Sequence, residues 1–374
     1  ASVRASWARR QSYRHRSVGL RPRVAAALVG RRLGRNSRGS PGLRWPRTAV
    51  GSYDVSVMAV GSRPLVPSRL APGGVAAHAS RRKPTSVIGA YIALTKPRII
   101  ELLLITTIPT MVLAQQGWPP ARLVIVTLIG GTLAAGGANA INMYVDRDID
   151  ALMERTQNRP LVIGIIEPRN ALVFAVALQI AAFAVLWAGA NLLSAVLAFS
   201  AAAFYVGIYT LWLKRTSRQN IVIGGAAGAV PVLVGWSAVQ NSLGWEPLVL
   251  FVVMFLWTPP HFWALAVKYS DDYSAADVPM LPSVAPMAEV VKQMIIYTVA
   301  LVAATLVLWP VASLGLIYGI SAIVLGAIFI WGTIALGKNP TAAASMRLFG
   351  YSITYVTLLF GAMMLDVFVE HGVS

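Results

Sequence analysis

The sequence predicts an all-α polytopic membrane protein with nine transmembrane helices. Hydrophobic residues make up 56% of its 374 residues, and charged residues only 12%. From Thr95 onward, apolar segments recur at the length that a helix needs to cross the hydrocarbon core of a bilayer. Polar connections separate these segments, and their basic residues fall mainly in alternate connections. We therefore expect the working part of the chain to lie in a lipid bilayer.

Nine apolar segments follow one another along the chain. They cover roughly residues 99–117, 121–143, 170–190, 193–213, 220–240, 246–267, 291–311, 313–336 and 348–369. Several contain glycine and proline, which membrane helices tolerate where neighbouring helices satisfy the backbone. We expect each segment to form one transmembrane helix.

The charges between the segments predict how the helices are oriented. One set of connections holds most of the basic residues: Lys96, Arg98, Arg147, Arg155, Arg159, Arg169, Lys214, Arg215, Arg218, Lys268, Lys292, Lys338 and Arg347. The opposite set holds Arg122 together with the acids Glu246, Asp366 and Glu370. The positive-inside rule then places the N-terminus in the cytoplasm and the C-terminus on the far side, as an odd number of helices requires.

Residues 1–85 are predicted to be a disordered extension, distinct from a membrane domain over residues 86–374. Residues 1–57 contain thirteen arginines, no lysine and one acid, so they carry +12 of the net charge of +18. Three interpretations stay open: an organellar targeting segment, a cytoplasmic tail, or translated upstream sequence before a start at Met58. Because the excess charge lies in this extension, it does not indicate nucleic-acid binding.

Two common kinds of site are excluded by composition. The absence of cysteine rules out disulfides and thiolate metal sites. The four histidines, His15, His78, His261 and His371, are scattered and match no zinc-binding spacing.

A row of oxygen ligands is predicted at the end of the second apolar segment. Asn142, Asp146 and Asp150 are spaced four residues apart, and on a helix such side chains drift by only about 40° per step. Magnesium commonly binds through one or two carboxylates together with the phosphate oxygens of a substrate. Ionisable groups at a membrane helix are costly and are functional by default. Asp148 points about 200° away from Asp146, so we expect it to be a surface residue.

A second acidic loop is expected on the same side of the membrane. It contains Asp271, Asp272 and Asp277, and with the first row it suits two magnesium ions that share a diphosphate. Same-side cations that could hold phosphate oxygens are Arg155, Arg159, Lys214 and Arg215. The alternatives are a solvated loop for the acids and positive-inside anchors for the arginines.

These residues resemble the UbiA family of intramembrane prenyltransferases, whose first signature is N-x-x-x-D-x-x-x-D. The longer string from Asn142 to Pro160 resembles the haem-farnesylating branch of the family, as does the T-P-P-H-F-W string at residues 258–263. Further matches lie at residues 209–215, 219–228 and 271–282, so the resemblance covers about residues 90–370. The second motif departs from the usual pair of Asp residues four apart, because Asp271 and Asp272 are adjacent. Which of Asp271, Asp272 and Asp277 would bind a second magnesium therefore stays open, with Asp272 preferred.

The resemblance implies transfer of a farnesyl group from farnesyl diphosphate to a vinyl group of haem B, giving haem O. It implies Mg²⁺ as the cofactor. It also implies a multi-pass protein of the bacterial plasma membrane, with its N-terminus and active site facing the cytoplasm. The alternative location is the mitochondrial inner membrane. His261 would then contact the haem, the other reading being a buried histidine with a satisfied hydrogen bond. Oligomeric state and delivery of the product to a haem A synthase or a terminal oxidase stay open.

Two other functions are weighed against this one. A member of the same family could prenylate a quinone or another aromatic precursor, although the T-P-P-H-F-W string and the Arg155-Thr-x-x-Arg-Pro string argue against it. A transporter or haem-handling factor without chemistry would explain the helices. It would not explain two acidic clusters on one face.

Overall fold

The structure, a computed structural model, describes residues 86–372, with the side chains of residues 99 and 102–104 excepted. The elements within this range are all helices, which confirms the predicted all-α class. The extension predicted for residues 1–85 lies outside the described residues. A domain boundary at residue 86 therefore stays a prediction.

Within residues 86–372, each predicted apolar segment falls on a helix or a continuous helical run. In chain order these are α2 (Pro97–Gln115), α3 (Ala121–Val145), α5 (Pro168–Gly189), the run of α6 (Leu192–Phe204), η1 (Tyr205–Leu213) and α7 (Lys214–Thr216), α8 (Asn220–Gln240), α9 (Trp245–Lys268), α12 (Met287–Val311), α13 (Leu316–Lys338) and α14 (Ala342–His371). Eight of them are long and apolar enough to cross a membrane, whereas the described apolar stretch of α2, Ile105–Gln115, is shorter. The chain is a polytopic membrane protein, and the exact count of nine spans stays a prediction.

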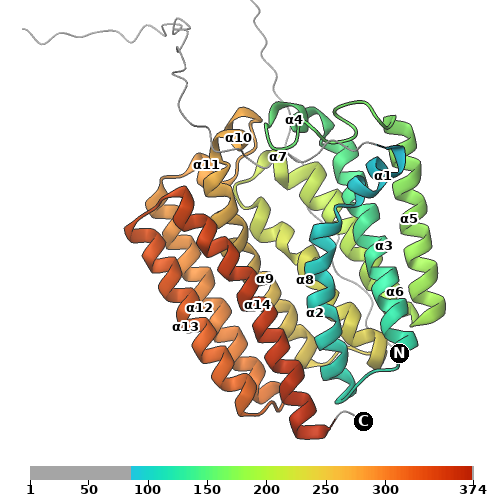
Figure 1. The fold of residues 1–374 in the computed structure, drawn as a ribbon, viewed down its shortest axis with the longest axis vertical. Coiled ribbons are helices and arrows are strands. Elements are labelled where there is room, and N and C mark those ends of the chain that lie inside the picture. The colour runs from blue at the N-terminus through green and yellow to red at the C-terminus, as the bar shows by residue number, and fades with distance from the viewer. Residues whose placement is uncertain (1–85, 373–374) are drawn as a thin grey trace, which may run out of the picture. The chain divides into compact units, whose positions relative to one another are not determined.

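The short helices are α1 (Val87–Thr95), α4 (Arg147–Leu152), α10 (Ser270–Ala275) and α11 (Leu281–Val284). Figure 1 shows that α4, α7, α10 and α11 gather at one end of the helical bundle, whereas the C-terminal end of α14 lies at the other. Both acidic stretches of the sequence are thus carried to the same end of the bundle. We call this end the mouth.

Prolines and capping side chains set several helix starts. Pro97 and Pro168 occupy the first turn of α2 and α5, where the missing N–H would have no partner within the helix. Asn191 caps α6 by accepting a hydrogen bond from Ser194 N at 2.9 Å, and Thr341 caps α14 in the same way.

Small residues let the helices approach closely. A Cβ added at Gly137 of α3 would lie 2.9 Å from the carbonyl oxygen of Ala175 in α5, so this contact requires glycine. Close approach through small residues is a common way for membrane helices to pack, since lipid supplies no hydrophobic drive between them. The largest buried cluster lies elsewhere, between α2, α8, α9, α12, α13 and α14, and includes Trp263, Tyr318 and Phe329.

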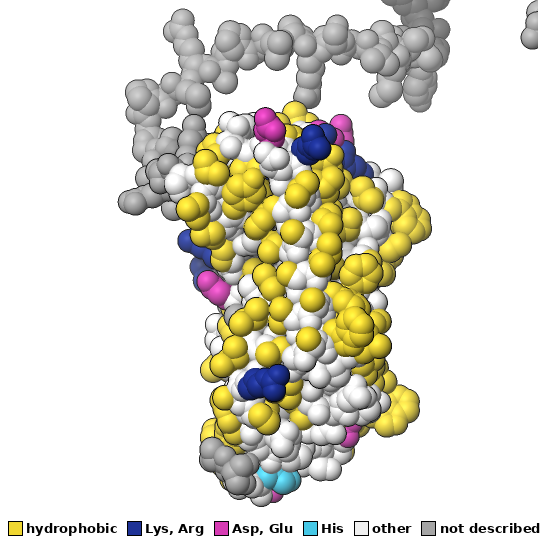
Figure 2. Space-filling model, turned by 90° about the vertical axis from the view of Figure 1, so that its right-hand side faces the viewer, with side chains coloured by type: hydrophobic (Ala, Val, Ile, Leu, Met, Phe, Trp, Pro, Cys, Tyr) yellow, Lys and Arg dark blue, Asp and Glu magenta, His cyan; other side chains and the backbone are white. Residues whose placement is uncertain are grey.

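Large apolar side chains also cover the outside of the bundle. Trp331 is 71% exposed and Ile180 is 67% exposed, although both lie in apolar helices. Figure 2 shows hydrophobic side chains spread over most of one face, with few charged side chains among them. Such a surface is suited to contact with lipid tails rather than water.

A buried acid fixes the end of the bundle opposite the mouth. Asp366 of α14 is 1% exposed, and it accepts hydrogen bonds from the backbone N–H groups of Gly315 and Tyr318 at the start of α13. It therefore caps a neighbouring helix across a tertiary contact. We expect Asp366→Ala to lower the free energy of unfolding by about 1–2 kcal/mol. The unfolding midpoint in detergent would report this, with Leu365→Ala, an exposed neighbour, as the control that leaves it unchanged.

Candidate active site

The predicted oxygen row is formed by the end of α3 and the start of α4. Asp146 N donates to the Asn142 carbonyl at 2.9 Å, and Asp150 N donates to the Asp146 carbonyl at 2.8 Å, so helical hydrogen bonding continues through the junction. All three side chains are buried. Asn142 Nδ2 also donates to Asp146 Oδ2 at 2.7 Å. The spacing in the sequence thus brings an amide and two carboxylates into one buried row.

Three cations from three other parts of the chain meet this row. Lys214 forms an ion pair with Asp146, and Arg159 forms one with Asp150. Lys96 donates from Nζ to Asn142 Oδ1 at 2.9 Å. Burial and the nearby Arg159 and Lys214 lower the pKa of Lys96 well below its usual value. Buried charges of both signs therefore face one another at the mouth.

Lys96 is a site residue that sequence reasoning missed, because it was treated only as a topology marker. It lies between α1 and α2 with a φ of 53°, in the left-handed region. Asn139 Nδ2 donates to the carbonyl of Thr95 next to it, which fixes this junction against α3. A lysine directly before Pro97 at the start of an apolar helix was the available signal.

A π-helix positions Lys214. The segment η1 ends at Leu213, and Asn142 Nδ2 donates to the Thr210 hydroxyl within it at 3.1 Å. The rings of Tyr205 and Tyr209 stack with centroids 5.3 Å apart. Tyr209 lies so close to Gly224 of α8 that any Cβ there would collide with its ring. The wider turn of η1 therefore brings Thr210 and Lys214 to the row from one side, a use typical of π-helical segments at functional sites.

The donor set fits a divalent cation of the magnesium type. Asp146 Oδ1 and Asp150 Oδ1 are buried and accept no hydrogen bond from any described residue. Free carboxylate oxygens in a buried place are costly unless a cation or donor meets them. Among residues 86–372, no group of three or more His, Asp and Glu side chains is arranged to hold a metal. A metal here would therefore need Asn142 and oxygens of water or of a substrate to complete its ligands.

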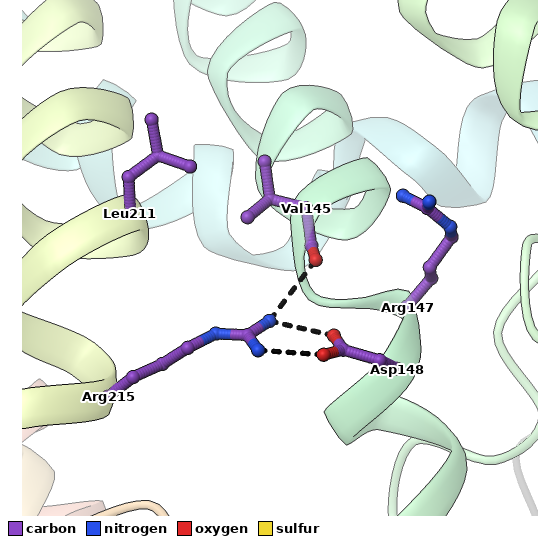
Figure 3. Close-up of a pocket in the computed structure, with 5 residues that line it drawn as sticks. All are labelled: Val145, Arg147, Asp148, Leu211 and Arg215. Atoms are coloured by element: carbon purple, nitrogen blue, oxygen red, sulfur yellow. Dashed lines mark hydrogen bonds and ion pairs between the residues drawn. The ribbon is translucent and has the colours of Figure 1, made fainter.

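Arg215 and Asp148 form the rim of the mouth. Both terminal guanidinium nitrogens of Arg215 donate to Asp148 at 2.7 Å, and Nη2 also donates to the Val145 carbonyl at 3.2 Å (Figure 3). The hydrogen bonds from Arg215 lower the pKa of Asp148 to about 2. These residues line a pocket of about 450 Å³ with Arg147 and Leu211. Asp148 is exposed, as expected from its place on the helix.

The second acidic loop reaches the same region through Asp272. Its carboxylate accepts hydrogen bonds from the backbone N–H groups of Glu154 and Arg155 at 3.2 and 3.3 Å. Arg155 in turn donates to the hydroxyl of Tyr273 at 3.2 Å and lies over the Tyr269 ring. Asp271 and Asp277 are exposed. The two stretches are therefore joined through Asp272 and through the contacts of Arg155 with the two tyrosines.

His261 lies in α9, buried among aromatic rings. It stacks between Trp257 and Phe349, with centroids 4.1 and 4.5 Å away. The Ser352 hydroxyl lies 2.6 Å from the Phe349 carbonyl oxygen and 2.7 Å from His261 Nδ1. In the tautomer with its proton on Nδ1, His261 donates to Ser352 Oγ and keeps the lone pair on Nε2. The hydrogen bond expected of a buried histidine is present, and the free lone pair is what a metal ligand needs.

Known proteins are similar to this chain in sequence and in fold. The model of the UbiA prenyltransferase family matches residues 103–361. The chain is 50% identical over 289 residues to a protoheme IX farnesyltransferase of Streptomyces avermitilis, covering 76% of this chain and 95% of the relative. It is 52% identical over 301 residues to a protein of the same name from Kineococcus radiotolerans, covering 76% and 89%.

A solved structure shares the fold at low identity. It is a UbiA homolog from Archaeoglobus fulgidus bound to DMAPP and Mg²⁺, with a TM-score of 0.53 and 16% identity. The match covers 73% of this chain and 99% of that one. Since the family model spans more than half of the chain and the relatives are matched over most of their length, the chain belongs to the UbiA prenyltransferase family.

Proposed function

We propose that the chain transfers the farnesyl group of farnesyl diphosphate to a vinyl group of haem B, giving haem O and diphosphate. The observation that carries this proposal is the identity of 50% and 52% to two proteins named protoheme IX farnesyltransferase, over most of their length. The T-P-P-H-F-W string and the complete first motif in this chain support it. The alternative of a transporter that catalyses no reaction does not explain why the chain matches a family of prenyltransferases.

The reaction balances with water as the third reactant. The C1–O bond of farnesyl diphosphate breaks, C1 bonds to the terminal vinyl carbon, and the other vinyl carbon takes a hydroxyl from water, which loses a proton. Lys96, Arg159, Lys214 and Arg215 would hold the oxygens of the diphosphate as negative charge develops on it. Arg155 would lie beside them, held by Tyr269 and Tyr273. The isoprenoid tail would lie among the apolar helices.

Asn142, Asp146 and Asp150 would hold a magnesium ion at the mouth. The free oxygens Asp146 Oδ1 and Asp150 Oδ1 support this assignment, as does the Mg²⁺ bound by the Archaeoglobus homolog. When bound, the ion would neutralise charge on the departing diphosphate. Asp272 and Asp271 stay the proposed ligands of a second ion. Asp272 would then exchange its backbone contacts with Glu154 and Arg155 for the metal.

We assign His261 to the haem substrate. In the tautomer that donates from Nδ1 to Ser352, its Nε2 lone pair would be free to ligate haem iron, and the hydrogen bond with Ser352 orients its ring. We expect His261→Ala to weaken haem binding about tenfold to a hundredfold, and to leave farnesyl diphosphate binding intact. Titration of the purified protein with haem, followed by its Soret absorbance, measures the first affinity. Equal haem affinity in the variant and the wild type would remove the assignment.

The charge pattern and the relatives favour the plasma membrane of a bacterium, with the mouth facing the cytoplasm. Cysteine substitutions at Glu154 and Trp245, tested in cells with a membrane-impermeant thiol reagent, would check this placement. Labelling of position 245 alone, before the cells are opened, is the expected outcome.

The decisive experiment incubates the purified chain with haem B, farnesyl diphosphate and Mg²⁺. The expected product is haem O, identified by its mass, and it should not form when Mg²⁺ is replaced by EDTA. Turnover of a quinone precursor in place of haem would overturn the substrate and leave the family assignment intact. Failure with both acceptors would overturn the proposed function.

A further inference from the structure

Asp148 has a contact that its position in the motif does not require. It lies between Asp146 and Asp150 but faces away from the buried row, and its side chain is 60% exposed. It nevertheless binds Arg215 with both carboxylate oxygens at 2.7 Å (Figure 3). A two-point contact of this kind fixes the plane of the guanidinium as well as its distance.

Arg215 has a second acid within reach. Its Nη2 lies 3.8 Å from Asp146 Oδ1, which is outside hydrogen-bonding distance. That oxygen is one of the two buried carboxylate oxygens of the row that accept no hydrogen bond from the described residues. The other oxygen of Asp146 already contacts Lys214 and Asn142. A small movement of Arg215 would therefore let its guanidinium donate a hydrogen bond to Asp146 Oδ1, the free oxygen of that carboxylate.

We propose that Asp148 is a positioning residue that holds the Arg215 guanidinium away from Asp146 Oδ1 and so keeps this oxygen free for a divalent cation. The inference rests on the proposed metal site. Asp148 faces away from the buried row, but through Arg215 it would affect how the row binds a metal ion. Without Asp148, the nearest carboxylate to Arg215 is Asp146, and the guanidinium would compete with the metal there.

Metal binding to the full-length protein in detergent, without substrate, tests this directly. Mn²⁺ serves as the probe, and its free concentration is read by electron paramagnetic resonance. We expect Asp148→Asn to weaken Mn²⁺ binding about tenfold to a hundredfold. Asp148→Glu should retain most of the affinity because it keeps the carboxylate. Glu154→Gln removes an exposed acid six residues further along, and should have little effect.

The double variant Asp148→Asn/Arg215→Gln shows whether Asp148 acts by positioning Arg215 or only through its negative charge. If Asp148 acts by holding Arg215, Arg215→Gln changes the affinity little in the wild type but restores it in the Asp148→Asn background. An equal gain from Arg215→Gln in both backgrounds would mean that the charges act additively, and would overturn the proposal. So would unchanged binding in Asp148→Asn, or equal weakening in the single and double variants.

Failure of the metal site itself would look different. Asp146→Asn should abolish the Mn²⁺ binding that the wild type shows. If the wild type bound Mn²⁺ no more tightly than Asp146→Asn, the metal site of the proposed function and the role of Asp148 would both be overturned. If the wild type bound Mn²⁺ strongly and Asp148→Asn bound it equally well, the role of Asp148 would be overturned and the metal site would stand.

Discussion

Replacing Asp146 with asparagine is expected to lower the rate of farnesyl transfer about a thousandfold, which corresponds to about 4 kcal/mol in the transition state. Asp146 is completely buried, contacts Asn142 and Lys214, and keeps one oxygen free. Asparagine preserves its size but removes the charge that a magnesium ion requires. The measurement is the single-turnover formation of haem O at saturating haem B and farnesyl diphosphate.

A matched control comes from the other end of the bundle. Asp366→Asn makes the same substitution at an equally buried acid, whose partners are backbone N–H groups at the start of α13. It should lower the unfolding midpoint and leave the rate per folded molecule within about twofold. If Asp146→Asn reduced the rate no more than Asp366→Asn does, Asp146 would have no role in the chemistry.

The buried row of oxygen-bearing side chains was predictable because helix geometry acts over short distances in the sequence. A spacing of four residues places Asn142, Asp146 and Asp150 on one side of any helix, and the junction between α3 and α4 does not interrupt it. The same rule correctly placed Asp148 on the outside. The all-α class and the family were predictable for a similar reason, since they depend on segment length and local motifs.

The partners of the row depend on long-range packing and were not all predictable. Lys96 meets Asn142 across 46 residues, and its only local signal, the place directly before Pro97, is one that an ordinary positive-inside lysine can also occupy. The π-helical turn of η1 was also missed, although it brings Thr210 to Asn142. Asp272 was expected beside a metal. The structure shows that it binds the backbone of the turn after α4, a contact that tertiary packing sets and that no local pattern predicts.

Lys214→Met should move two measurements in opposite directions. The Lys214 ammonium forms an ion pair with Asp146 and thus occupies a carboxylate that the proposed metal ion would also need. Methionine keeps an unbranched side chain of similar length, so the main loss is the charge. Without substrate, Mn²⁺ binding should tighten, because a competing cation has been removed. Farnesyl transfer should nevertheless fall about a hundredfold, because a cation that stabilises the departing diphosphate is lost.

These opposite effects follow only if Lys214 changes partners during the reaction cycle. The lysine forms an ion pair with Asp146, and it would turn to the diphosphate if a metal ion took that carboxylate. Lys338→Met, an exposed lysine at the end of α13, is the matched control and should change neither quantity. Weaker Mn²⁺ binding in Lys214→Met would contradict the exchange. It would mean that the metal and Lys214 do not share Asp146, and that the cluster of Asn142, Asp146 and Lys214 serves to hold α3 and η1 together.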